Sequence, residues 1–458
     1  MSLILPDPLV RAPAPPADLL VRGAHVLDPR TGLDGPRDVL VRDGEIAEIG
    51  APGTLAAPPG AEIVEGEGRH LFPGFVDPHV HLRTPGQEHK EDLETGTRAA
   101  AAGGFCQVIT MPNTDPVVDS PSVMGALRDA AAHQARIPVG VLGAVTRGLR
   151  GEELTEMAAL REAGALGFTD DGRPVVSAGM LRRALRYQRL VGGVLALHEE
   201  DPTLSGGGAM HEGRVSALLG IAGIPSTSES VMIARDAELA GYEGAAVHMQ
   251  HLSCAASVRA VATAKELGWD VTAEASPHHL CLTEDAVRSL DTSMKMNPPL
   301  RTEEDRLALI EGLRSGVIDC VATDHAPHAR DEKEVPFEQA PMGTTGLETA
   351  FAALHALLVR PGVLGLGLVV ERMTCGGARF GLPIPRVAVG EPANLTLIDL
   401  EQRWTPGDDG YESRSENCCF AGTELSGRVL LTVAAGSVAY RERSFVLCAA
   451  PEPGEEHR

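Results

Sequence analysis

Short apolar segments alternate with helix-favouring stretches through the middle of the chain. The apolar segments begin at residues 75, 104, 137, 165, 193, 245, 270 and 317 and read FVDPHVH, GFCQVITM, IPVGVLG, ALGFTD, GVLALH, AAVHMQH, DVTAEAS and VIDCVATD. Stretches rich in Ala, Leu, Glu and Arg separate them, such as LETGTRAAAAGG, MLRRALRYQRLV and SVRAVATAKELG. This alternation predicts an α/β chain whose strand–helix units close into a (β/α)8 TIM barrel. A doubly wound open sheet is the alternative.

The two ends of the chain have a different pattern. Residues 18–70 form short alternating segments such as LLVRGAHVLD and DVLVRDGEIAEIG, and NLTLIDL and GRVLLTVAAGSVAYRERSF follow residue 385. Both regions are typical of antiparallel strands joined by turns. Because the ends of a domain commonly lie close together, we expect them to form one small β-sandwich domain. The predicted division is residues 1–72 and 385–458 for the β-sandwich and 73–384 for the barrel.

Composition narrows the kinds of function. The 458 residues include 63 acidic and 40 basic side chains, a net charge of −23 that disfavours nucleic acid as a partner. No uncharged apolar run could span a bilayer, and the first residues lack the basic and apolar regions of a signal peptide. We therefore expect a soluble, cytoplasmic protein without a membrane partner. The 8 cysteines form no C-x-x-C pair, so any metal must be bound by histidine and carboxylate.

Residues that commonly bind metals stand at the ends of the predicted strands. Because side chains alternate along a strand, His79, His81 and Arg83 in DPHVHLR should share one face. The C-terminal ends of barrel strands meet at one mouth, which is where barrel enzymes place their chemistry. Four other segments end in such residues: Asp170 and Asp171, His198, His251, and Asp324. The sequence therefore predicts a metal centre at this mouth.

Each of these residues also has an ordinary structural interpretation. His198 alone could be a buried core histidine, and Asp170 and Asp171 could be turn residues before a glycine. Arg83 alone could be a surface residue in a salt bridge. If His251 points into the barrel, strand alternation makes His248 outward or structural. The convergence of the whole set favours the functional interpretation.

The longer motifs resemble the amidohydrolase superfamily and, within it, the type I dihydroorotases of bacteria. The similarity extends from residue 73 to residue 349 and is carried by PGFVDPHVHLRTPGQEHKEDLETGTRAAAAGGF, VITMPNTDP, GFTDDGRPV, LHEED, HMQHLS, SPHHLCLT, KMNPPLR, ATDHAPH and GTTGLET. HLRTPG together with MPNT and KMNPPLR is a specific combination, whereas H-x-H alone is not.

The resemblance implies a centre with one or two zinc ions, of which we expect two. His79 and His81 would bind the first with Asp324, His198 and His251 would bind the second, and Asp171 would bridge them. Many superfamily relatives bridge their metals with a carboxylated lysine instead. This chain has no lysine between Lys90 and Lys265, which excludes that variant and argues against dihydropyrimidinase and allantoinase.

The resemblance also implies the reaction, the reversible interconversion of N-carbamoyl-L-aspartate and L-dihydroorotate in pyrimidine biosynthesis. A metal-bound hydroxide would attack the ring amide, with Asp324 as general acid and base. The residues implied to contact the substrate are Arg83, Asn113, Asn297 and His328.

Other residues near these motifs receive different interpretations. We expect backbone groups near residues 341–343 to lie within reach of the substrate, whereas His89, His278 and His279 are interpreted as structural. Glu199 stands where the family often has cysteine, so we expect altered hydrogen bonding to the neighbouring ligand His198.

Two alternative functions stay open. One is another cyclic amidase, acting on hydantoins, dihydropyrimidines or allantoin. The other is a non-catalytic, dihydroorotase-like scaffold for aspartate carbamoyltransferase, which would be expected to lose metal ligands. The expected partners are the small-molecule substrate, a second copy of the chain in a homodimer, and aspartate carbamoyltransferase.

Overall fold

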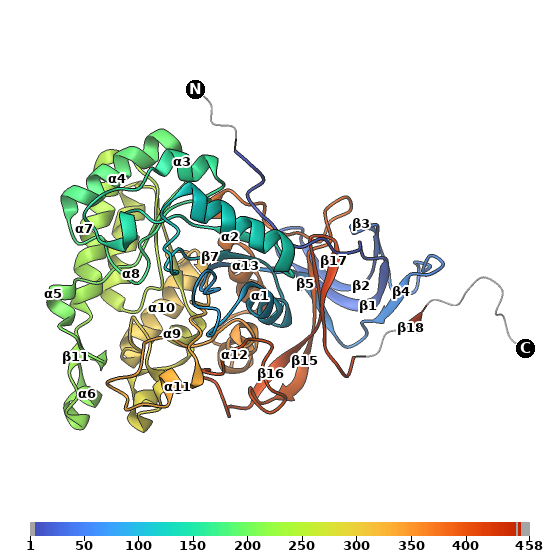
Figure 1. The fold of residues 1–458 in the computed structure, drawn as a ribbon. Helices are drawn as coiled ribbons and strands as arrows, with labels where there is room; N and C mark the ends of the chain where they lie inside the picture. Colours follow the sequence, from blue (N-terminus) through green and yellow to red (C-terminus); the bar gives the residue numbers. More distant parts are fainter. Residues whose placement is uncertain (1–4, 446–447, 450–458) are drawn as a thin grey trace, which may run out of the picture.

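Both ends of the chain contribute strands to one sheet of nine strands (Figure 1). The structure, a computed structural model, describes residues 5–445 and 448–449; residues 1–4, 446–447 and 450–458 of the expected β-sandwich segments lie outside the described residues. The strands are β1 (Leu19–Asp28), β2 (Leu33–Arg42), β3 (Glu45–Gly50), β4 (Glu62–Glu65), β5 (His70–Pro73), β15 (Leu395–Trp404), β16 (Leu425–Ala434), β17 (Ser437–Arg441) and β18 (Cys448–Ala449).

Strand β5 joins the two halves of this sheet. Its Leu71 is paired with Val26 of β1 on one side and with Leu397 of β15 on the other. The far ends of the sheet also meet, because the backbone of Ala17 bonds to both Gly44 and Gly436. A side chain at Gly44 would place its Cβ 2.8 Å from the Gly436 carbonyl oxygen, so this contact requires glycine. The sheet therefore folds around one apolar core, and the predicted domain built from both chain ends is confirmed.

The barrel strands all run parallel. Isolated bridges from Phe168 to Gly143 and to Leu195 place the fourth predicted segment between the third and the fifth. A bridge from Val80 to His325 joins the first segment to the eighth and closes the ring. The TIM barrel is thus confirmed, and the open sheet is wrong. The strands are β6 (Phe75–Val80), β7 (Phe105–Thr110), β8 (Val139–Val141), β9 (Leu195–Leu197), β12 (Val247–Met249), β13 (Val271–Ala275) and β14 (Cys320–Val321).

The fourth segment contributes only a single bridged residue because its end is held by a side chain. The carboxylate of Asp170 accepts hydrogen bonds from the backbone N–H groups of Val145 (2.8 Å) and Thr146 (3.0 Å). These bonds fasten the end of the segment to the loop that follows β8. Asp170 is therefore used structurally, and Asp171 after it is free to face the barrel mouth.

Helices follow the strands as the sequence predicts. Helix α4 begins after Ser177, whose hydroxyl accepts a hydrogen bond from the backbone of Met180, and it buries Leu181 and Leu185. The helices are α1 (Leu93–Ala102), α2 (Pro121–Gln134), α3 (Met157–Glu162), α4 (Ala178–Val191), α5 (Pro202–Ser205), α6 (Arg214–Leu219), α7 (Thr227–Glu243), α8 (Ala255–Glu266), α9 (Pro277–Cys281), α10 (Glu303–Ser315), α11 (Arg330–Lys333), α12 (Ala350–Leu354) and α13 (Leu366–Thr374), and β10 (Met210–His211) with β11 (Gly223–Ile224) forms a small separate sheet.

An apolar cluster links successive barrel strands with the segment after α13. It includes Ile109, Leu142, Leu166, Ala196 and Phe380. None of the helices in the described part of the chain combines the length and apolar character that crossing a membrane requires. The boundaries at residues 72/73 and 384/385 stay a prediction.

Candidate metal centre and active site

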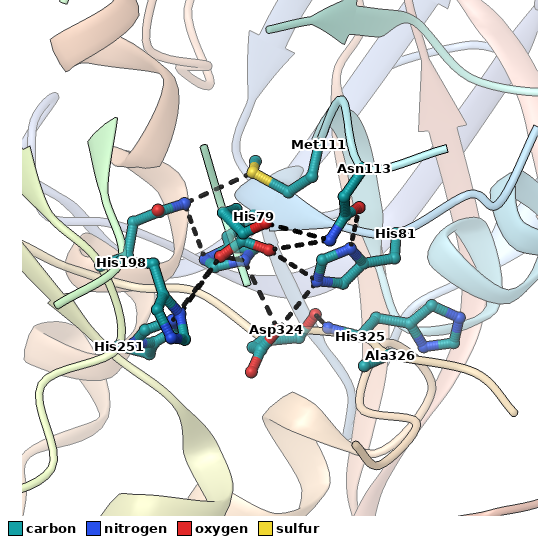
Figure 2. Close-up of polar contacts among 12 residues, drawn as sticks. His79, His81, Met111, Asn113, His198, His251, Asp324, His325 and Ala326 are labelled. Atoms are coloured by element: carbon teal, nitrogen blue, oxygen red, sulfur yellow. Dashed lines mark hydrogen bonds and ion pairs between the residues drawn. The ribbon is translucent and has the colours of Figure 1, made fainter. Parts of the chain in front are cut away.

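All six predicted ligand residues lie together at the C-terminal ends of the barrel strands. Figure 2 labels five of them, all but Asp171. His79 belongs to β6, and the others follow strands or, for Asp171, the bridged segment at Phe168. All six side chains are buried. The six residues are His79, His81, Asp171, His198, His251 and Asp324.

Two histidines and two carboxylates form the first group. His79 Nε2 lies 3.4 Å from Asp171 Oδ1 and 3.5 Å from Asp324 Oδ1. His81 Nε2 lies 3.2 Å from Asp324 Oδ1 and 3.5 Å from Asp171 Oδ2. Five potential ligand atoms from four residues thus surround one small volume.

A second group shares Asp171 with the first. His198 Nδ1 lies 2.8 Å from His251 Nε2, and Asp171 Oδ1 lies 3.6 Å and 3.7 Å from these two atoms. In each of the sets His79, His81, Asp171 and Asp171, His198, His251, the potential ligand atoms lie within 4.8 Å of one another. Asp171 is therefore placed between two potential cation positions.

The outer nitrogens of the first two histidines are already occupied, which leaves the inner nitrogens for a cation. His79 Nδ1 lies 2.7 Å from Glu274 Oε1, and His81 Nδ1 lies 3.0 Å from Asn113 Oδ1. His79 Nε2 is buried and has no hydrogen-bond partner among the described residues. Metal-binding histidines are commonly held in this way by acceptors on the far side of the ring. The arrangement of donors therefore fits a bound metal.

The electric field of the site also favours a cation. Burial lowers the pKa of His79, but the carboxylates of Asp171, Glu274 and Asp324 outweigh it and hold that pKa well above its usual value. Burial raises the pKa of Asp324, but nearby histidines, His79 first, lower it to about 2. Positive charge is thus stabilised where these groups meet.

Three site residues have left-handed backbone conformations. The φ angles are 59° at Arg83, 32° at His251 and 48° at Asp324. Non-glycine residues with such values are strained and cluster at functional sites. Strand β6 ends at Val80, so Arg83 lies near the ligand cluster because of a turn and not because of strand alternation.

Of the two expectations for His248, outward or structural, the structure agrees with a structural role and not with an outward orientation. This buried histidine lies in β12, with Nε2 3.0 Å from Glu274 Oε2 and Nδ1 2.8 Å from Thr272 Oγ1. Glu274 in turn contacts His79 of the site, so His248 points inward. Strand alternation fails as a guide because β12 ends at Met249 and the backbone turns at His251.

Arg83 is a buried cation without an ion pair. Its side chain is 8% exposed, and its Nε donates to the carbonyl of Pro327 at 3.2 Å. Within the described residues, its terminal NH2 groups make no hydrogen bond and no acidic side chain lies within ion-pair distance. Burial lowers the pKa of this guanidinium to about 10. Because arginine is seldom buried unpaired, the position is suited to an anionic ligand.

The other three predicted substrate residues surround the ligand cluster. Asn113 donates to Asp171 Oδ2 at 3.2 Å, and Asn297 donates to Glu200 Oε2 at 2.6 Å. His328 Nε2 donates to the Met342 carbonyl at 2.9 Å. Burial, and then the charge of Arg83, lowers the pKa of His328 to about 3.

The residues interpreted as structural behave in two ways. His89 is exposed, and His279 Nε2 bonds to the Pro298 carbonyl at 2.9 Å. His278 is buried and its Nε2 has no partner among the described residues. Glu199 is buried and, within the described residues, makes no hydrogen bond to His198, whose nearest acid on its own loop is Glu200 at 3.7 Å. Any effect of Glu199 on His198 is therefore not exerted through a direct hydrogen bond.

Sequence reasoning missed three residues that support the site. Glu274 contacts His79, Glu200 lies between His198 and Asn297, and Asn417 accepts from the backbone of His328 at 3.0 Å. An acid within the apolar segment DVTAEAS was a usable signal for Glu274. Asn417 belongs to the C-terminal part of the chain, where no local motif indicates contact with a barrel loop.

Comparison with known proteins assigns the family. The profile of the "Dihydro-orotase-like" family matches residues 68–257. The dihydroorotase of Pelotomaculum thermopropionicum is 46% identical over 426 residues, covering 93% of this chain and 99% of that protein. The dihydroorotase of Geobacter sp. strain M21 is 44% identical over 425 residues, covering 93% and 99%. The chain belongs to the dihydroorotase family. The expected family is thus confirmed, and a metal-binding site agrees with it.

Solved structures similar to this dihydroorotase family member share its whole fold. An L-hydantoinase (dihydropyrimidinase) from Arthrobacter aurescens aligns with a TM-score of 0.81 and 25% identity, covering 94% of this chain and 98% of that one. A D-hydantoinase (dihydropyrimidinase) from Thermus sp. aligns with a TM-score of 0.79 and 26% identity, covering 93% and 96%. The barrel and the sheet domain therefore occur together in related amidohydrolase structures.

Proposed function

We propose that this chain is a dihydroorotase that interconverts N-carbamoyl-L-aspartate and L-dihydroorotate, with release or uptake of water, in pyrimidine biosynthesis. The observation that carries the proposal is the buried, unpaired Arg83 beside a centre of histidines and carboxylates. L-dihydroorotate and N-carbamoyl-L-aspartate both carry a carboxylate that the guanidinium can bind with two parallel hydrogen bonds. The dihydroorotases named above support the same substrate.

Two zinc ions are the proposed cofactor. His79, His81 and Asp324 would hold the first, His198 and His251 the second, and Asp171 both. Imidazole nitrogen and carboxylate oxygen are common zinc ligands, and the buried free nitrogen of His79 fits that use. When bound, zinc acidifies water to provide a nucleophile at neutral pH and polarises the amide carbonyl.

Asp324 is the proposed proton carrier. Its lowered pKa keeps it ionised at neutral pH, and its Oδ2 makes no hydrogen bond within the described residues. In ring opening, a C–O bond forms at the amide carbonyl and the C–N bond breaks. Asp324 accepts the proton of the attacking water and delivers it to the leaving nitrogen. Ring closure uses the same carboxylate in the opposite order, with water as the leaving group.

The substrate is proposed to be held on the side opposite the nucleophile. Arg83, with Asn113 and His328, would bind the carboxylate, and Asn297 would contact the ring. To take part, the Nε2–H of His328 would exchange the Met342 carbonyl for a carboxylate oxygen of the substrate. Arg83 and His328 are both buried, so these contacts would form away from bulk water, where charged hydrogen bonds are strong. Binding an anion would also offset the unfavourable free energy of burying the unpaired charge of Arg83.

Two rival functions are less well supported. The hydantoinase structures keep another cyclic amidase as a second candidate, but the relatives at 44–46% identity are dihydroorotases and the unpaired Arg83 favours a substrate with a carboxylate. A non-catalytic scaffold for aspartate carbamoyltransferase would not require a full ligand set, and all six ligand residues are present.

Metal analysis combined with turnover tests this proposal. We expect one to two zinc ions per purified chain, two at full loading, and hydrolysis of L-dihydroorotate in preference to hydantoin, dihydrouracil and allantoin. Zinc binding without turnover of L-dihydroorotate, or faster turnover of an uncharged cyclic amide, would reject the substrate. A homodimer, association with aspartate carbamoyltransferase and a cytoplasmic location stay predictions; light scattering, with and without the carbamoyltransferase, measures the first two.

A further inference from the structure

Glu274 touches both halves of the metal centre from beneath. Its Oε1 lies 2.7 Å from His79 Nδ1 in the first group and accepts from the backbone N–H of His251 in the second at 3.2 Å. Its Oε2 lies 3.0 Å from His248 Nε2. Glu274 is 1% exposed, so these contacts are shielded from bulk solvent. Every one of its contacts comes from another barrel element.

The chemistry of a carboxylate decides the protonation of its neighbours. An ionised carboxylate only accepts hydrogen bonds, so His79 must carry its proton on Nδ1 to bond with Glu274. His79 Nε2 faces Asp171 and Asp324, so it is the nitrogen whose proton a metal ion would displace on binding. The contact with the His251 backbone also holds the end of β12, where the chain enters its left-handed turn.

A second histidine fixes Glu274 itself. An ionised Glu274 carboxylate only accepts, so His248 Nε2 carries a proton directed at Glu274 Oε2, and the hydroxyl of Thr272 holds the other side of the ring, 2.8 Å from His248 Nδ1. Thr272 and Glu274 lie two residues apart on β13, so their side chains share one face of that strand. His248 is paired with Thr272 on the neighbouring strand β12. The carboxylate therefore cannot rotate without losing a buried hydrogen bond.

We propose that Glu274, held by His248, is a positioning residue that sets the tautomer of His79 and aligns the two halves of the metal centre with each other. The inference rests on the proposed metal centre. It assigns no contact between Glu274 and the substrate. Loss of its charge should therefore affect metal binding and the rate of the chemical step, and substrate affinity much less.

The grouping of Glu274 with His248 and Cys320 has a different explanation from a third metal site. The potential ligand atoms of these three residues also lie within 4.8 Å of one another. Both carboxylate oxygens of Glu274 already accept hydrogen bonds, however, and a cation bound there would have to displace the His79 or His248 contact. We therefore assign Glu274 to positioning.

The test compares Glu274→Gln with a matched control, Asp28→Asn. Asp28 is also fully buried, and it accepts backbone N–H bonds from Arg30 (2.9 Å) and Val387 (2.8 Å), remote from the ligands. We expect Glu274→Gln to weaken zinc affinity about 10- to 100-fold, measured on metal-free protein by competition with a chelator. The kcat for dihydroorotate should fall at least about 10-fold, with KM changed less than about 3-fold. Asp28→Asn should keep wild-type zinc affinity.

Two further measurements separate positioning from general destabilisation. Cobalt-substituted Glu274→Gln should show an altered visible absorption spectrum, because His79 would turn relative to the metal. If Glu274→Gln fails to fold by circular dichroism, His248→Leu removes only the Oε2 contact and should weaken zinc binding in the same direction by a smaller factor.

Specific results would overturn the assignment. Zinc affinity, kcat and cobalt spectrum like those of the wild type in a folded Glu274→Gln protein would do so, as would unchanged zinc affinity in His248→Leu. A third zinc lost in Cys320→Ser would also contradict it. Because zinc affinity is measured without substrate, a wild-type protein that binds zinc but does not turn over dihydroorotate would reject the proposed function and leave this inference standing.

Discussion

Replacing Arg83 with methionine tests whether this chain selects an anionic substrate. The side chain is buried, and its terminal NH2 groups have no partner within the described residues. Methionine keeps most of the apolar stem and removes the charge and the fork. Among the described residues, the only bond lost is the 3.2 Å bond from Nε to the Pro327 carbonyl. The variant therefore removes the group proposed to bind the substrate carboxylate and disturbs the folded protein little.

The expected loss follows from the hydrogen bonds that the guanidinium can make. Hydrogen bonds to charged groups contribute about 1.5 to 3 kcal/mol each, and part of this is recovered when water solvates the substrate carboxylate. A net loss of about 3 kcal/mol corresponds to roughly a 150-fold rise in KM for L-dihydroorotate, since about 1.4 kcal/mol is a factor of ten. The kcat should change less than about threefold, because the guanidinium contacts a part of the substrate that does not react.

Steady-state hydrolysis of L-dihydroorotate, with zinc content measured on the same samples, checks this prediction. Arg83→Lys is the matched control, because it keeps the charge but loses the planar fork and should give an intermediate KM. The melting temperature should not fall in Arg83→Met, because burial of an unpaired cation is itself unfavourable. A KM within about threefold of wild type, with zinc retained, would refute the reasoning.

Three further perturbations have defined outcomes. Asp324→Ala should stay folded and retain zinc while kcat falls about 100- to 10,000-fold, measured by turnover and metal analysis; full turnover would remove the proton carrier. Asp171→Asn should bind zinc at least about 10-fold more weakly in chelator competition, since both groups share this carboxylate; equal affinity would contradict the bridging role. Burial raises the pKa of Glu348 from 4.5 to about 7, so the folded protein binds the extra proton. The protonated carboxyl of Glu348 therefore adds to the free energy of unfolding. This stabilisation is fully present below about pH 4.5 and is lost as the pH rises through about 7. Glu348→Gln should flatten that part of the stability profile in denaturant titrations, and an unchanged slope would exclude Glu348 as its source.

The supporting residues were the part of the site that could not be predicted. The motifs located His79, His81, His198 and His251 at strand ends, but their partners come from elsewhere in the barrel. Glu274 was not singled out, although it stands in a predicted strand, because its value depends on three neighbours that the fold brings to it. Partners of this kind are fixed by distances across the barrel, which no local pattern contains.

The sequence by itself determined the order of strands and helices, the sheet domain from both chain ends and the cluster of candidate metal ligands at the strand ends. These features follow from hydrophobic periodicity and residue type, which act over a few neighbouring positions. Only the tertiary structure decided that His248 points inward, that Arg83 is buried without an ion pair and that Asn417 supports the loop of His328. The physical reason is that strand alternation ends where a strand ends. Beyond that point, left-handed turns and packing against distant segments set the direction of each side chain.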